Sequence, residues 1–193
     1  MNLPNKLTIT RIILTFLIII FCLFPFYSLN IYFPKFNIAG LVVDSTYLIA
    51  GVIYIIAALT DYFDGMIARR DNLITDTGKL LDAIADKVLV NSVLIIFAVN
   101  GFLPSFVPII YIFRDEVVNA LKMSALRKGK VVAAIKSGKI KTASMMIGLA
   151  LMFFYNLPFE LINLKVADFL IYFAVIMSVV SGIEYYNLWK KIK

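Results

Sequence analysis

The most regular feature of the sequence is a succession of long apolar stretches separated by short polar connections. A helix that crosses the roughly 30 Å hydrocarbon layer of a membrane needs about 20 mostly apolar residues. Six stretches approach that length, and they cover residues 12–26, 41–59, 80–99, 106–126, 143–155 and 166–188. The pattern therefore predicts an all-α polytopic integral membrane protein with six transmembrane helices, forming a single domain over residues 1–193.

The composition excludes a soluble globular domain. Hydrophobic residues make up 62% of the 193 residues and charged residues only 16%, with a mean hydropathy of +0.91. A soluble domain has about 25% charged residues. The 19 Lys and Arg residues exceed the 12 Asp and Glu residues, but they fall in a few clusters between apolar runs. This is a membrane pattern and not a nucleic-acid-binding surface.

The positions of the basic residues predict how the chain is oriented. They gather before the first stretch, between the second and third, between the fourth and fifth, and at the end of the chain. Basic residues favour the cytoplasmic connections of a membrane protein. We therefore expect both termini and the connections 70–79 and 127–141 to be cytoplasmic, and the uncharged connection 100–105 to be external.

The chemistry open to this chain is limited by two residue types. The sequence has no histidine, and its one cysteine, Cys22, lies inside an apolar run. Ser-His-Asp catalysis, Cys-His catalysis, zinc clusters and intrachain disulfides are therefore excluded. Proton transfer or metal binding must use carboxylates, whose oxygen atoms favour Mg²⁺, Mn²⁺ or Ca²⁺.

Four carboxylates stand where the apolar pattern predicts membrane helices. Asp61 and Asp64 follow the second stretch at helical spacing i and i+3, and Asp82 and Asp86 open the third at i and i+4. Ionisable groups at such depth cost a few kcal/mol each unless they are paired or face a wet cavity. If 70–79 turns the chain back, the four acids meet and repel one another. Divalent metal ions would remove that repulsion.

Salt bridges and an ion pathway are the alternatives to a metal site. The acids could form interfacial salt bridges with nearby basic residues, which are Arg69, Arg70, Lys79 and Lys87. They could also mark the pathway of an ion-coupled transporter. Transporters commonly show internal repeats or broken helices in matching positions, and the sequence shows neither. Small residues beside the acids, which would let a ligand approach the backbone, favour a binding site instead.

Written out, the acidic segment is Asp61-x2-Asp64-Gly65-x2-Ala68-Arg69-x8-Gly78-x3-Asp82-x3-Asp86. It resembles the signature of the CDP-alcohol phosphotransferases, integral membrane enzymes of phospholipid synthesis, at every fixed position. Three further segments resemble the bacterial phosphatidylglycerophosphate synthases within this family. They are Pro4-Asn5-x2-Thr8-x2-Arg11, Arg114-Asp115 and Gly138-Lys139-x-Lys141-Thr142. One position departs, because those enzymes commonly have arginine where Lys122 stands. Lysine keeps the charge but loses the bidentate fork.

The resemblance implies a reaction and a location. The reaction is transfer of a phosphatidyl group from CDP-diacylglycerol to the primary hydroxyl of sn-glycerol 3-phosphate, giving phosphatidylglycerophosphate and CMP. It implies a bacterial cytoplasmic membrane enzyme with its active site facing the cytoplasm, two Mg²⁺ or Mn²⁺ ions, and a homodimer. Two alternatives stay open: the same chemistry with another acceptor, such as an inositol phosphate or phosphatidylglycerol, and the ion-coupled transporter.

The resemblance also implies a role for each site residue. The metal ligands are Asp61, Asp64, Asp82 and Asp86, with Asp86 also taking the acceptor proton. The CDP-diacylglycerol site consists of Asn5, Thr8, Asp61, Gly65, Ala68, Arg69 and Gly78. The glycerol 3-phosphate site consists of Arg114, Lys122, Lys139 and Lys141. Arg114 and Lys122 are just over two helical turns apart, which places both on one face of the fourth stretch.

Overall fold

The computed structural model describes residues 3–38, 40–70, 76–130 and 132–192, and for residues 3–4, 62–70, 76–77 and 79–80 it describes the backbone alone. Six α-helices make up most of this part of the chain. They are α1 (Leu3–Leu23), α2 (Ser45–Arg70), α3 (Asp76–Val99), α4 (Phe106–Arg127), α5 (Lys136–Phe153) and α6 (Val166–Lys190). The predominantly helical fold confirms the coarse prediction from the apolar pattern.

Most helices differ in their bounds from the apolar runs that predict them. Helix α1 begins at Leu3 and α5 at Lys136, well before the first apolar residues of their stretches, and α2 continues to Arg70. Hydropathy detects only the apolar part of a helix, whereas Lys, Thr and Arg continue the helical backbone at little cost. Helix α1 ends at Leu23, earlier than predicted, because Pro25 cannot continue it.

A small β-hairpin, which the apolar pattern does not predict, accompanies the helices. Strands β1 (Lys35–Ile38) and β2 (Leu41–Asp44) pair antiparallel, with Phe36 opposite Val43. The first residues of the predicted second span therefore form β2, in which the β-branched pair Val42-Val43 favours a strand. At the end of the hairpin, the Asp44 carboxylate accepts a hydrogen bond from the Thr46 backbone N–H, over 2.9 Å. This bond satisfies a donor in the first turn of α2.

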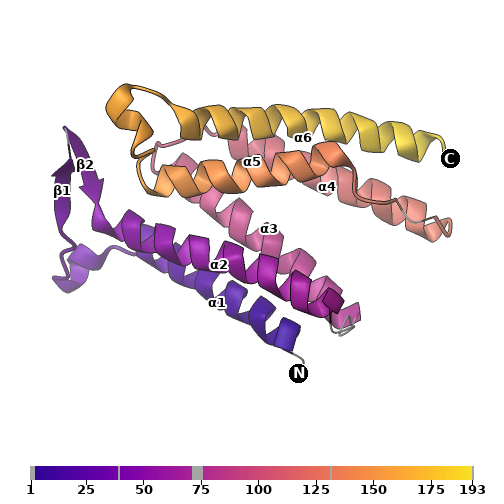
Figure 1. Ribbon diagram of the computed structural model, residues 1–193, viewed down its shortest axis with the longest axis horizontal. Helices are drawn as coiled ribbons and strands as arrows, with labels where there is room; N and C mark the ends of the chain where they lie inside the picture. The colour runs from indigo at the N-terminus through magenta and orange to yellow at the C-terminus, as the bar shows by residue number, and fades with distance from the viewer. Residues whose placement is uncertain (1–2, 39, 71–75, 131, 193) are drawn as a thin grey trace.

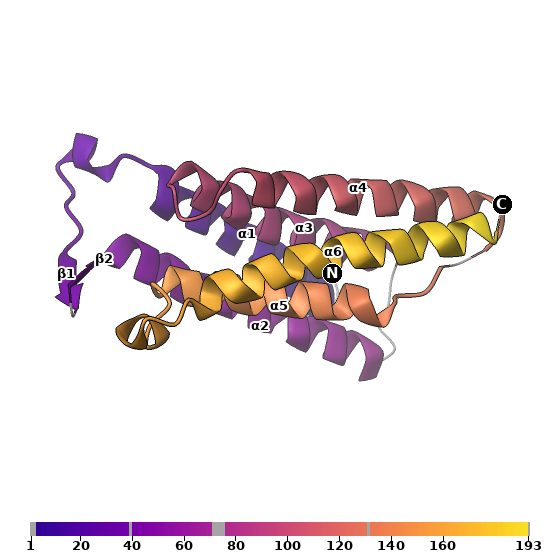
Figure 2. The ribbon, with the colours of Figure 1, turned by 90° about the horizontal axis from the view of Figure 1, so that it is seen from above.

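The helices form two groups that pack against each other. Helix α1 packs against α2 and α3, and α6 packs against α4 and α5, while α2 contacts α5 and α3 contacts α4 (Figures 1 and 2). Gly51 allows the close contact of α2 with α5, because a Cβ atom there would lie 2.7 Å from the Phe153 Cβ. Small residues have this role at many helix interfaces in membranes.

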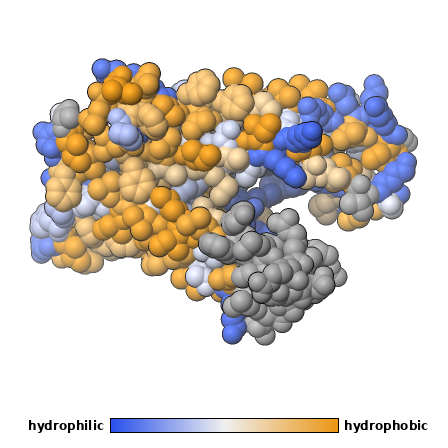
Figure 3. Space-filling view, in the orientation of Figure 1, coloured by the Kyte–Doolittle hydropathy of each residue, from blue (hydrophilic) through white to orange (hydrophobic). Residues whose placement is uncertain are grey.

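The two ends of the bundle differ. Both chain termini and the polar ends of α2 and α4 lie at one end, and the hairpin and the 3₁₀ helix η2 (Phe159–Ile162) lie toward the other (Figure 1). Apolar side chains cover much of the flank between them, with hydrophilic side chains gathered mainly at the right-hand end (Figure 3). Phe113 of α4 and Phe169 of α6 are 70% and 67% exposed, which suits contact with lipid.

Two of the helices are long and apolar enough by themselves to cross a membrane, among the residues that the structure describes. They are Asn5–Leu23 and Val166–Lys190, with Ser45–Asp61 as a shorter apolar helix. The other predicted spans carry polar or charged residues along their length. The sites described next show where those residues lie.

Candidate active site

A buried arginine on α1 is the centre of the first polar cluster. Thr8, Arg11 and Thr15 lie at spacings of three and four residues on one face of α1, and each is at most 3% exposed. This face continues into Ile18, which belongs to the apolar core. The face is the one that packs against α2 and α3, so Arg11 enters the space between these two helices.

Three carboxylates from α2 and α3 converge on Arg11. Its Nη1 atom lies 2.8 Å from Asp61 Oδ1, 3.0 Å from Asp82 Oδ1 and 3.2 Å from Asp86 Oδ1. We call Asp61, Asp82 and Asp86 the carboxylate cluster. The structure thus brings together three of the four acids whose spacing predicts convergence. The side chain of the fourth, Asp64, lies outside the described residues.

The cation that the structure describes in this cluster is not one of the four basic residues that the salt-bridge hypothesis names. Arg11 occupies the position, while Lys87 bonds Glu116 of α4 over 3.0 Å. The side chains of Arg69, Arg70 and Lys79 lie outside the described residues. Sequence reasoning named Arg11 in a family motif but gave it no role in the site, because membrane orientation already accounts for a basic residue before the first span. Its spacing from Thr8 and Thr15 was the available signal, since it predicts a buried polar face.

The carboxylate cluster suits a divalent cation by its charge and donor atoms. One buried guanidinium and three partly exposed carboxylates leave an excess of two negative charges among these four groups. Carboxylate oxygens are the ligands that Mg²⁺ and Mn²⁺ prefer. Among the described residues no three such side chains are already arranged as a metal-binding set, and in the cluster the position within reach of all three acids is taken by Arg11 Nη1. Metal binding therefore stays a prediction.

Next to the carboxylate cluster lies a cavity of about 710 Å³ lined by basic residues of α4 and α5. Its lining includes all four residues predicted for the acceptor, which are Arg114, Lys122, Lys139 and Lys141. We call it the basic cavity. Asp61 also lines it, and a smaller cavity of about 100 Å³ is lined by Asp86, Asp115 and Lys141. The acidic and basic groups therefore adjoin each other inside the bundle.

Asp115 holds two of the four cations. Its Oδ1 atom accepts hydrogen bonds from Arg114 Nη1 over 2.7 Å and from Lys141 Nζ over 2.6 Å. The Asp115 carboxylate thus fixes the side chains of both Arg114 and Lys141, and both residues line the cavity. Lys122 and Lys139 add two further positive charges to the lining. The basic cavity keeps an excess of positive charge, which suits an anion with more than one negative charge.

Tyr185 of α6 is a further residue of the basic cavity, and sequence reasoning missed it. Its hydroxyl accepts a hydrogen bond from the Ile135 backbone N–H over 3.3 Å, and its ring lies 4.6 Å from Lys122 Nζ. A cation over an aromatic ring is stabilised electrostatically. This contact shows how a lysine is accommodated at position 122. No sequence signal distinguished Tyr185 from the many other aromatic residues of the chain.

The residues predicted for CDP-diacylglycerol are less fully described. Asn5 is half-buried and Thr8 is buried in the first turns of α1, and Gly78 is half-buried in the first turn of α3. The described lining of the basic cavity includes none of these three. Gly65, Ala68 and Arg69 belong to the last turns of α2, but their side-chain environments lie outside the described residues.

Comparisons with known proteins place the chain among similar sequences. The model of the CDP-alcohol phosphatidyltransferase family matches residues 1–180. A relative in Bacillus subtilis, named "CDP-diacylglycerol--glycerol-3-phosphate 3-phosphatidyltransferase", is 38% identical over the whole chain and 97% of the relative. A relative of the same name in Mycoplasma pneumoniae is 34% identical over the whole chain and 89% of the relative.

A third relative comes from Mycobacterium tuberculosis. It is named "Probable phosphatidylglycerophosphate synthase", and it is 30% identical over 95% of this chain and 79% of its own length. The match to the family model includes the carboxylate cluster and every residue named for the basic cavity except Tyr185. It confirms the resemblance inferred from the acidic motif. The chain therefore belongs to the CDP-alcohol phosphatidyltransferase family.

Proposed function

We propose that the protein transfers a phosphatidyl group from CDP-diacylglycerol to the primary hydroxyl of sn-glycerol 3-phosphate. The names of the relatives in Bacillus subtilis and Mycoplasma pneumoniae support this reaction. One structural observation carries it: the carboxylate cluster adjoins a cavity with an excess of positive charge, and Asp61 belongs to both. An acidic site and an anion site in contact suit a reaction between a pyrophosphate donor and a phosphorylated acceptor.

The acceptor phosphate is assigned to the basic cavity. Arg114, Lys122, Lys139 and Lys141 line it, and Asp115 neutralises only part of their charge. Glycerol 3-phosphate is a dianion near neutral pH, so several cations are needed to replace the water that it loses on binding. Phosphatidylglycerol and other acceptors without a terminal phosphate dianion would leave part of this charge uncompensated.

The metal ions are assigned to the acidic side. Asp61, Asp64, Asp82 and Asp86 would hold two Mg²⁺ or Mn²⁺ ions, which the excess negative charge of the carboxylate cluster supports. When bound, such ions neutralise charge on a pyrophosphate. Asn5, Thr8, Gly65, Ala68, Arg69 and Gly78 would line the CDP part of the donor beside them.

Asp86 is assigned as the general base. It lines the smaller cavity together with Asp115 and Lys141, so it shares that cavity with one of the four acceptor cations. The acceptor oxygen attacks the β-phosphorus of CDP-diacylglycerol, and its proton passes to the Asp86 carboxylate. The bond between the β-phosphorus and the bridging oxygen breaks, and CMP leaves with that oxygen.

The membrane arrangement is part of the proposal. We infer six spans with both termini cytoplasmic, because each α-helix has at least 18 residues and approaches the thickness of a bilayer. The two termini lie at the same end of the bundle (Figure 1). The membrane would be the bacterial cytoplasmic membrane. The homodimer that the family resemblance implies stays a prediction.

Single-cysteine labelling tests this orientation. In a Cys22→Ala background, a membrane-impermeant maleimide is expected to label Ser105→Cys in intact cells and Lys130→Cys only after the cells are opened. Both positions are exposed in the structure, so failure to react reports the membrane and not burial. Labelling of Lys130→Cys from outside intact cells would overturn the orientation and the cytoplasmic placement of the site.

A CMP-release assay with purified protein tests the proposed function. We expect CMP release from CDP-diacylglycerol with glycerol 3-phosphate and Mg²⁺, and much slower release with an inositol phosphate, phosphatidylglycerol or no acceptor. Removal of divalent ions with EDTA is expected to abolish release, and added Mg²⁺ to restore it.

Two outcomes of that assay would contradict the proposal. Faster release with another acceptor would keep the family chemistry but reassign the basic cavity. Unchanged CMP release in EDTA would overturn the assignment of metal ions to the carboxylate cluster. Lys128→Ala serves as the control variant, because Lys128 is exposed and is not among the residues lining the basic cavity.

A further inference from the structure

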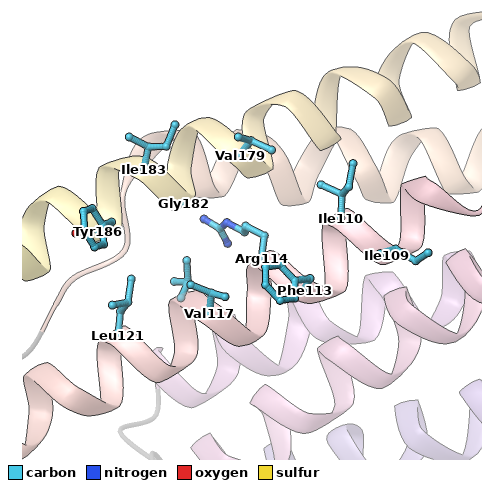
Figure 4. A pocket seen from close by; sticks show the side chains of 11 residues that line it. Ile109, Ile110, Phe113, Arg114, Val117, Leu121, Val179, Gly182, Ile183 and Tyr186 are labelled. Carbon is cyan, nitrogen blue, oxygen red and sulfur yellow. The ribbon is translucent and has the colours of Figure 1, made fainter.

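Four buried or half-buried residues of α6 form one stripe beside Arg114. Ser178, Ser181, Gly182 and Tyr185 are spaced at i, i+3, i+4 and i+7, which places them on the same helix face. Ser178 and Ser181 are fully buried and Tyr185 is 5% exposed. Helix α6 packs against α4, and the close view shows the Arg114 side chain directed from α4 toward α6 at Gly182 (Figure 4).

This stripe takes up much of the hydrogen-bonding capacity of Arg114. The Arg114 Nε atom donates to the Ser178 backbone carbonyl over 2.7 Å, and Nη2 donates to the Ser181 hydroxyl. The Ser181 hydroxyl in turn donates to the Met177 carbonyl over 2.8 Å, so its oxygen is oriented as an acceptor for the arginine. Together with the bond from Nη1 to Asp115, each nitrogen of the guanidinium has a fixed partner.

The donor count shows what is left for a substrate. A guanidinium has five N–H donors, and the bonds to Ser178, Ser181 and Asp115 use three of them. Among the described residues, one N–H on Nη1 and one on Nη2 have no further partner. Two donors on neighbouring nitrogens of a planar fork match two oxygens of one phosphate. The α6 contacts therefore fix the guanidinium while these two donors stay available to an acceptor phosphate.

Gly182 sets how closely the stripe approaches the arginine. A Cβ atom at this position would lie 3.3 Å from Arg114 Cγ and 3.5 Å from Arg114 Nε. The distance to Cγ is tight for a methyl group, so an alanine would require the arginine stem to shift from α6 by a few tenths of an ångström. The displacement would lengthen the bonds to Ser178 and Ser181.

We propose that Ser181 and Gly182 are positioning residues for Arg114, and that through it they determine the affinity for the acceptor phosphate. This inference rests on the proposed assignment of Arg114 to that phosphate. Neither residue brings a charge, and each acts only through the side chain that it holds. Helix α6 thereby contributes to acceptor recognition although its part of the stripe contains no cation.

The test compares Ser181→Ala and Gly182→Ala with the wild type in two measurements. The first is the KM for glycerol 3-phosphate and for CDP-diacylglycerol, and the second is binding of inorganic phosphate by calorimetry. Loss of one charge-assisted hydrogen bond is expected to raise the glycerol 3-phosphate KM and the phosphate Kd about tenfold. The CDP-diacylglycerol KM should change less than about twofold, and Ser181→Thr should restore most of the affinity.

Ser178→Ala is the matched control. Ser178 is as buried as Ser181, but within the described residues its hydroxyl has no hydrogen-bond partner, and Arg114 bonds only its main-chain carbonyl. The same loss of a hydroxyl should therefore leave phosphate binding within about twofold of the wild type. An equal effect of Ser178→Ala and Ser181→Ala, or an equal change in both KM values, would overturn the positioning role.

The binding measurement separates this inference from the proposed function. If the wild type binds phosphate but does not transfer a phosphatidyl group to glycerol 3-phosphate, the proposed function fails. A higher phosphate Kd in Ser181→Ala would still support the positioning role. Wild-type phosphate binding in both Ser181→Ala and Gly182→Ala would overturn the positioning role whatever the activity. Gly182→Ala retains the Ser181 hydroxyl. If Ser181→Ala proves unstable, the phosphate Kd of Gly182→Ala therefore still tests the positioning role.

Discussion

Replacing Asp86 with asparagine is expected to lower kcat for CMP release by about 10²- to 10⁴-fold, the usual contribution of a general base. The amide keeps the shape of the side chain and one oxygen atom but cannot accept the acceptor proton. CDP-diacylglycerol should still bind, so the loss should appear in kcat and not in the KM of the donor. Substrate binding and CMP release are measured in the same preparation over a range of Mg²⁺ concentrations.

Glu116→Gln is the control for Asp86→Asn, because it makes the same change from carboxyl to amide on an exposed side chain of the neighbouring helix α4. Its turnover should stay close to that of the wild type. Near-normal turnover in Asp86→Asn would eliminate Asp86 as the base. Recovery at high Mg²⁺ would instead assign it to metal binding alone.

Replacing Arg11 with alanine is expected to destabilise the protein by about 3 kcal/mol when divalent ions are absent. Removal of one partner of a buried ion pair costs about 3 to 5 kcal/mol, and the lower value applies because the three acids are between 30% and 49% exposed. For a chain of this size the melting temperature should fall by roughly 6 to 12 °C. Thermal unfolding in detergent with EDTA measures the change.

Added Mg²⁺ tests whether a divalent ion can replace the Arg11 guanidinium in the carboxylate cluster. In Arg11→Ala, millimolar Mg²⁺ should recover most of the lost melting temperature, because three carboxylates without the guanidinium bind a divalent ion more strongly. Arg11→Lys should lose less stability, and Lys6→Ala, on an exposed position of the same helix, should lose little. An Arg11→Ala melting temperature equal to that of the wild type in EDTA would show that the guanidinium does not balance the acids.

The convergence of the acids could be predicted from the sequence, but the position of Arg11 could not. Helical spacing alone places Asp82 and Asp86 on one face, and a short connection brings them near Asp61. The partner of these acids depends on where α1 packs, and hydropathy carries no information on that choice. Arg11 also satisfied the expectation for a basic residue beside a first span, and its spacing from Thr8 and Thr15 indicates a polar helix face without saying which helices that face meets.

The contribution of α6 was hidden for a different reason. Ser181, Gly182 and Tyr185 carry no formal charge, and they stand in one of the most apolar stretches of the chain. Their significance arises from the packing of α6 against α4, which brings them to Arg114. The hairpin was missed for a local reason, because Val42 and Val43 extend the apolar run of the following helix without a break.

The location of Arg11 on the first helix also bears on the order in which the protein is made. Helices α1, α2 and α3 contain the whole carboxylate cluster together with its arginine, and they leave the ribosome before α4, α5 and α6. Acidic side chains exposed to lipid without a counter-charge are costly. Because Arg11 is synthesised first, each acid that follows finds a cation already in the membrane. The nascent chain can thus be inserted with part of this negative charge compensated, well before the cations of the basic cavity exist.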